Sequence, residues 1–91
     1  MKEELKRLGF NESKINKNIL MKESIHSNCG FLYWNKNFYV VMVWEMLKNC
    51  KNLQTLNLCI ANPVNKFIET EDIKQVRKYM RVVTNELRKI K

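Results

Sequence analysis

The chain has 91 residues, a hydrophobic fraction of 45% and a formal net charge of +8. This length predicts a single domain over residues 1–91, and the apolar fraction excludes an intrinsically disordered chain. The excess of lysine and arginine favours a polyanionic or acidic partner, although it says nothing about the fold.

The first ten residues, MKEELKRLGF, carry charges where a secretory signal would have its apolar region. The longest apolar run, Phe38 to Trp44, is too short to span a bilayer. We therefore expect a cytoplasmic protein with no membrane partner.

Residues 2–8, KEELKRL, predict a short helix with Leu5 and Leu8 on one face and Gly9 as its C′ residue. Its charges predict a pair between Glu3 and Lys6 or Arg7. Residues 11–28 are ambiguous, because Asn11 could cap a second helix or residues 18–25 could form a strand. The pattern favours the strand slightly.

Residues 31–44, FLYWNKNFYVVMVW, predict two strands joined by a tight turn at residues 35–37. Both faces of the second strand are apolar. This indicates a central strand covered on both sides, or a sheet face that meets a partner, such as a second copy in a homodimer. A buried helix over residues 38–47 is the alternative, and the valine-rich composition argues against it.

Residues 53–61, LQTLNLCIA, alternate and predict a last strand with Leu56, Leu58 and Ile60 on its core face. Asn62-Pro63 is expected to end that strand, and residues 64–69 to form a link.

Residues 70–91 predict a long amphipathic helix with Thr70 as its N-cap. Its apolar stripe comprises Ile73, Val76, Tyr79, Met80, Val83, Leu87 and Ile90. The predicted fold is therefore α+β: a short N-terminal helix, a three- or four-stranded antiparallel sheet, and the C-terminal helix packed across the sheet over Leu56, Leu58 and Ile60.

The opposite side of this last helix is strongly basic. The residues that fall there are Lys74, Arg77, Lys78, Arg81, Arg88 and Lys89. Like charges three or four residues apart repel each other, so this side is either a solvated face or a surface for a polyanion. Tyr33, Trp34 and Tyr39 are candidates for base stacking or for an interface, with the hydrophobic core as the alternative for each ring.

Catalytic and metal-binding signals are weak. The single histidine, His26, and Cys29 have an H-x-x-C spacing to which Cys50 and Cys59 could add zinc ligands, but no paired knuckle is present. The three cysteines are expected to be free thiols. We predict no catalytic residue, no metal and no cofactor.

We predict a small non-enzymatic binding protein that uses the basic side of the last helix against nucleic acid or an acidic protein surface. An alternative is an inhibitor or adaptor from a phage or mobile element that binds a larger protein, such as a host defence nuclease. A second alternative is a small ribonuclease-type enzyme that depends on His26.

Overall fold

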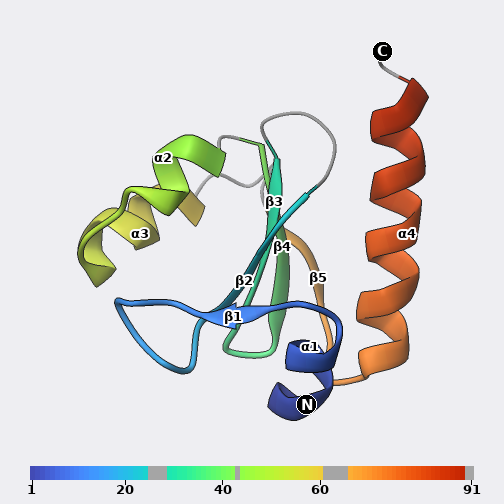
Figure 1. Cartoon of the computed structure of the whole chain (residues 1–91), viewed down its shortest axis with the longest axis horizontal. Helices are drawn as coiled ribbons and strands as arrows, with labels where there is room; N and C mark the ends of the chain where they lie inside the picture. Colours follow the sequence, from blue (N-terminus) through green and yellow to red (C-terminus); the bar gives the residue numbers. More distant parts are fainter. Residues whose placement is uncertain (25–28, 43, 61–65, 90–91) are drawn as a thin grey trace.

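A computed structural model of the chain describes residues 1–24, 29–42, 44–60 and 66–89, apart from the side chains of residues 66, 67 and 87–89. The elements in these ranges (Figure 1) are α1 (Lys2–Arg7), β1 (Asn11–Glu12), β2 (Leu20–Glu23), β3 (Gly30–Trp34), β4 (Asn37–Val41), α2 (Trp44–Lys48), α3 (Leu53–Ile60), β5 (Lys66–Glu69) and α4 (Ile73–Lys89). The strands form an antiparallel sheet in which their order is their order in the chain.

The sheet separates two layers of helices. In Figure 1, α2 and α3 lie on one side of the sheet, and α4 lies along the other with α1 near its N-terminal end. The first core, on the α1–α4 side, contains Leu5, Phe10, Leu20, Cys29, Phe31, Tyr33, Phe38, Val40, Val76 and Val83. The second core, on the α2–α3 side, contains Ile19, Leu32, Val41, Trp44, Leu47, Leu56 and Ile60.

Strand β4 is the predicted central strand that is covered on both sides. Phe38 and Val40 enter the first core, whereas Val41 enters the second and Tyr39 packs against it. Because Val41 is 0% exposed, the sheet face on which it lies is closed by its own chain. Val41 is thus covered within the chain, whereas residue 43 of the same predicted face lies outside the described residues, and the homodimer alternative stays a prediction.

The α+β class, the antiparallel sheet and both terminal helices are confirmed, but the sheet has five strands rather than three or four. The additional strands are short: β1 has two residues and β5 occupies part of the expected link. Such short strands cannot show the alternation from which strands are predicted. Of the alternatives for residues 11–28, β2 supports the strand, and residue 25 lies outside the described ranges.

The predicted hairpin turn is also confirmed. Asn35 and Lys36 have φ angles of 51° and 64°. These left-handed values are those of a two-residue turn whose twist matches that of the flanking strands. Asn tolerates this conformation because its short polar side chain bonds locally, so the signal was present in the sequence.

The strand predicted over residues 53–61 is wrong, because residues 53–60 form α3. Leu56 and Ile60 are one helical turn apart and are buried, whereas Leu58 is 74% exposed. A strand would place all three on one face. Since α3 lies on the side of the sheet opposite α4, the last helix does not cover these residues, and β5 rather than α3 completes the sheet.

The start of α3 explains this error. The side-chain oxygen of Asn52 accepts a hydrogen bond of 2.8 Å from the backbone N–H of Thr55. Asn52 is thus the N-cap of α3. Similarly, Trp44 begins α2 instead of ending a strand, and its ring fills the second core.

Helix α4 begins at Ile73 rather than at Thr70. Asp72 is its N-cap, since its Oδ1 accepts the backbone N–H of Lys74 at 2.9 Å. The hydroxyl oxygen of Thr70 accepts a hydrogen bond of 3.0 Å from the backbone N–H of Asp72. Thr70 therefore orders the turn that leads into the helix instead of capping it. The predicted stripe packs against the first core through Ile73, Val76, Tyr79, Met80 and Val83. The side chains of Leu87 and Ile90 lie outside the described residues.

Gly9 is the C′ residue of α1, as predicted, and has a φ of 102°. The N–H of Phe10 donates to the carbonyl of Leu5 at 3.1 Å, and the N–H of Gly9 donates to that of Lys6 at 3.0 Å. These two bonds define a Schellman motif, which needs a left-handed residue at the position of Gly9.

Two ion pairs connect α1 to β1. The Glu12 carboxylate lies 3.0 Å from the Lys2 Nζ and 2.9 Å from the Lys6 Nζ. Lys6 therefore pairs with Glu12, not with Glu3 as the sequence had suggested. The bonds to Lys6 and then to Lys2 lower the pKa of Glu12 to about 2.

Acid is expected to weaken this connection. Because the folded pKa of Glu12 lies below its ordinary 4.5, the stabilisation is complete above about pH 4.5 and is lost as the pH falls toward about 2. An NMR titration of the Glu12 carboxyl is expected to give a pKa of about 2. In the double variant Lys2→Met plus Lys6→Met, the pKa of Glu12 is expected to return toward 4.5. An unchanged pKa in that variant would contradict the assignment.

Candidate nucleic-acid interface

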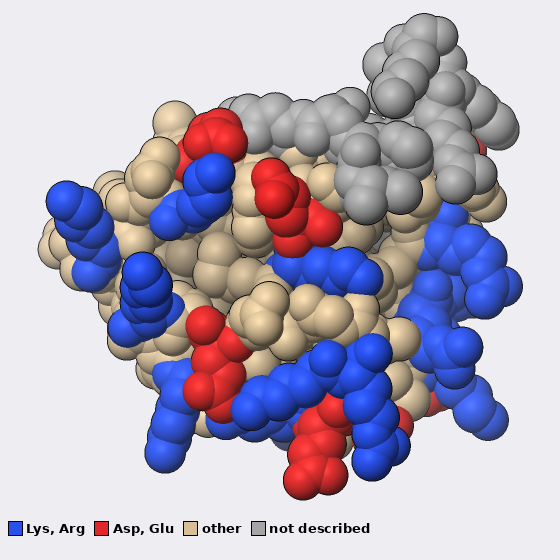
Figure 2. Space-filling model, in the orientation of Figure 1, with Lys and Arg blue, Asp and Glu red and all other residues tan. Residues whose placement is uncertain are grey.

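Helix α4 carries its positive charge on the side that faces away from the sheet. Val76 and Val83 occupy its buried side. The basic residues exposed on its outer side are Lys74, Arg77, Lys78 and Arg81, which we call the basic face. Figure 2 shows lysine and arginine side chains along the edge of the molecule that α4 forms. The side chains of Arg88 and Lys89, predicted to extend this face, lie outside the described residues.

Within the part of the chain that the structure describes, no carboxylate neutralises the basic face. Glu71 at the foot of α4 lies 3.7 Å from the Lys36 Nζ, and Asp72 is occupied as the helix N-cap. By contrast, Lys2 and Lys6 on α1 both pair with Glu12. The like charges on α4 repel one another by a few tenths of a kcal/mol per pair, so the face has an unbalanced positive potential.

The surface is slightly hollowed at this face. Lys74, Arg77, Lys78 and Arg81 line a shallow depression of about 310 Å³. A second depression, of about 200 Å³, lies between α1 and α4 and is lined by Glu4, Arg7, Leu8, Ile73 and Arg77. Because Arg77 lines both depressions, they form one continuous surface.

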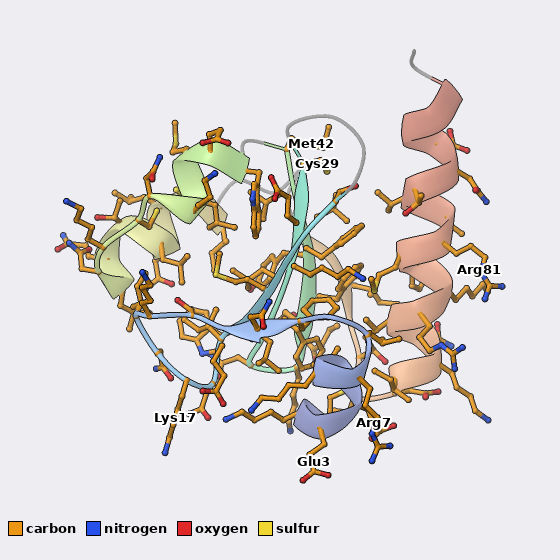
Figure 3. All side chains as sticks on the ribbon, in the orientation of Figure 1. Glu3, Arg7, Lys17, Cys29, Met42 and Arg81 are labelled. Atoms are coloured by element: carbon orange, nitrogen blue, oxygen red, sulfur yellow. The ribbon has the colours of Figure 1, made fainter. Side chains whose placement is uncertain are left out.

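Arg7 is a member of this surface that sequence reasoning missed. Figure 3 shows it beside the N-terminal end of α4, with Arg81 further along the helix and pointing away from the sheet. We had considered Arg7 only as a partner of Glu3 within α1. Arg7 lies next to Arg77 because α1 packs near α4, and no local sequence pattern predicts how two distant helices pack.

The acidic residue of the second depression is compensated. Glu4 lies 3.5 Å from the N-terminal ammonium group of Met1. The depression therefore keeps the charge of Arg7 and Arg77 available to an anion.

The aromatic candidates do not join the basic face. Tyr33 is 8% exposed in the first core, and its hydroxyl donates to the backbone carbonyl of Thr70. Burial, and secondarily Glu71, raise the pKa of Tyr33. Trp34 and Tyr39 are half-buried against the second core, on the side of the sheet opposite α4. A single surface that combines stacking rings with the α4 cations is therefore not assembled.

The cysteines are divided between the two cores. Cys29 is buried in the first core, whereas Cys50 and Cys59 pack against the second. Cys29 thus does not meet the other two as the zinc alternative required, and His26 lies outside the described residues. Among the described residues, no group of three or more histidine, cysteine, aspartate or glutamate side chains is arranged to hold a metal ion.

The fold and this surface define an α+β protein with an exposed basic helix. Within the described residues, no helix is both long and apolar enough to cross a membrane. Comparison of the chain with models of protein families, with curated proteins and with solved structures found no match.

Proposed function

We propose that the protein binds nucleic acid through the basic face, with Arg7 as an additional contact. The observation that carries this proposal is the absence, within the described residues, of any ion pair on Lys74, Arg77, Lys78, Arg81 or Arg7. These cations stand on two helices that the first core holds in place. A rigid row of uncompensated cations suits a regular row of phosphates, because binding releases the counterions of both surfaces.

The contacts we propose are to the phosphate backbone. Duplex DNA carries about one charge per 1.7 Å of its axis, and the rise from Lys74 to Arg81 is about 10 Å, so a duplex presents roughly six phosphates over this length. Arginine fits a phosphate because its guanidinium donates two parallel hydrogen bonds. Trp34 and Tyr39 lie on the side of the sheet opposite α4, so base stacking has no part in this proposal. Because contacts to phosphates carry no sequence information, we expect little sequence preference.

Charge reversal on the basic face tests the proposal. In about 50 mM salt, Arg77→Glu plus Arg81→Glu is expected to weaken binding to labelled random duplex DNA or RNA by roughly 30-fold or more, because two attractive contacts become repulsive. Fluorescence anisotropy measures this change. Circular dichroism should show an unchanged fold, since both side chains are exposed.

The matched control reverses two exposed lysines at the other end of the molecule. Lys14 and Lys17 precede β2, and Figure 3 shows Lys17 far from Arg81. Lys14→Glu plus Lys17→Glu makes the same change in net charge and is expected to weaken binding about threefold or less, through screened long-range repulsion. Equal losses in the two variants would contradict a localised site. Retention of an acidic protein with no binding to nucleic acid would favour the inhibitor or adaptor alternative.

A further inference from the structure

Cys50 and Cys59 bring their sulfur atoms into contact on the α2–α3 layer, away from the basic face. Cys50 follows α2, and Cys59 lies in the last turn of α3. Their Sγ atoms are 3.4 Å apart, and both side chains are half-buried. A disulfide has an S–S distance of about 2.05 Å. The two sulfurs are therefore about 1.4 Å further apart than in a disulfide.

A positively charged depression opens beside this pair. It has a volume of about 330 Å³ and is lined by Lys14, Ile15, Lys48, Asn49, Cys50 and Lys51. Lys48 lies 3.1 Å from Glu45, whereas Lys14 and Lys51 have no ion pair within the described residues. An anionic molecule is thus attracted to the surface at which the Cys50 sulfur is reached.

We propose that Cys50 and Cys59 form a redox-active dithiol, which an anionic low-molecular-weight disulfide oxidises to an intramolecular disulfide. The Cys50 thiolate attacks one sulfur of the small disulfide, forms a mixed disulfide and releases one thiolate. The Cys59 thiolate then attacks the Cys50 Sγ, closes the protein disulfide and releases the second thiolate. The two protein thiols lose two protons and two electrons, and the small disulfide gains them as two thiols.

The third cysteine provides an internal control. Cys29 is 0% exposed in the first core. Its sulfur neighbour is the Met42 thioether, with Sγ and Sδ 3.9 Å apart (Figure 3). A thioether cannot form a disulfide, and burial raises the pKa of the Cys29 thiol. We expect Cys29 to remain reduced while the pair reacts.

The rate of oxidation depends on pH. Burial, followed by the hydrogen bond and the charge of Cys59, raises the pKa of Cys50 to about 11. The charged groups that line the depression with Cys50 are Lys14, Lys51 and Lys48, of which Lys48 is paired with Glu45. Because the thiolate is the attacking species, oxidation is expected to be slow near neutral pH and to accelerate as the pH rises toward about 11.

The experiment exposes the reduced full chain, without oxygen and at low salt, to oxidised glutathione, which is anionic, and to hydroxyethyl disulfide, which is neutral. Mass spectrometry is expected to show the loss of two hydrogens with no adduct, and a peptide digest to show a Cys50–Cys59 link. In Lys14→Glu plus Lys51→Glu, the rate with oxidised glutathione is expected to fall about tenfold more than the rate with hydroxyethyl disulfide, whose smaller loss reports the lower thiolate fraction of Cys50 alone.

Single cysteine variants complete the test. Cys59→Ser is expected to stop at a mixed disulfide on Cys50, and Cys50→Ser is expected to lose most of the reaction, whereas Cys29→Ser reacts like the original chain. A digest that links Cys29 to either partner, or a chain that accumulates mixed disulfides without the Cys50–Cys59 link, overturns the dithiol. Equal losses of rate with both small disulfides overturn the role of the two lysines.

Discussion

Val83→Asp is expected to unfold the protein or to bring it close to unfolding. Val83 is 8% exposed on the sheet-facing side of α4 and belongs to the first core. A carboxylate without a partner in that position costs about 3–5 kcal/mol, whereas a protein of this length has a stability of roughly 5–15 kcal/mol. Urea denaturation followed by far-UV circular dichroism measures the loss.

Val82→Asp is the matched control, because it makes the same change one residue earlier. Val82 is 42% exposed on the outer part of α4. An aspartate there stays in water, and its cost is expected to be within about 0.5 kcal/mol. Similar losses at the two positions would contradict the orientation of α4 against the sheet, and with it the outward direction of the basic face.

Gly30→Ala is expected to cost about 3 kcal/mol through a steric clash. A Cβ atom on Gly30 would lie 1.9 Å from Cε3 and 2.4 Å from Cζ3 of the Trp44 ring. The ring is 6% exposed in the second core and has little room to move. Overpacking of this kind exceeds the gain of about 0.4–1 kcal/mol that replacing a glycine brings through the unfolded state.

Removal of the Trp44 ring should cancel that clash. Trp44→Leu alone is expected to cost about 1–3 kcal/mol of packing. It breaks no hydrogen bond, because the buried Trp44 Nε1 has no partner among the described residues. The double variant Gly30→Ala plus Trp44→Leu is therefore expected to be about as stable as Trp44→Leu alone. Additive losses in urea denaturation would show that the two residues do not contact each other.

The parts of the fold that could be predicted are those with strong local signals. Helix α4 has an apolar stripe over several turns, Asn35 and Lys36 form the expected turn, and Gly9 ends α1 as expected. The error at α3 arose because Leu56, Leu58 and Ile60 fit a strand by their alternation alone. The exposure of Leu58 depends on which layer the segment joins, and that is a property of the tertiary structure.

The candidate site also has parts that the sequence predicts and parts that depend on the tertiary structure. The basic face follows from helical spacing, so the sequence was sufficient to place Lys74, Arg77, Lys78 and Arg81 together. The addition of Arg7, and the contact between Cys50 and Cys59, depend on elements that pack against each other. The separation of Trp34 and Tyr39 from α4 likewise follows from the sheet between them.

The most direct test of the central claim is the salt dependence of binding to random duplex DNA. Four or five phosphate contacts predict that the logarithm of the association constant falls with the logarithm of the salt concentration with a slope of about −4. Arg77→Gln plus Arg81→Gln is expected to reduce the slope to about −2, since each lost contact removes about one unit. No binding at low salt, or an equal slope in the two proteins, would contradict nucleic-acid binding through the basic face.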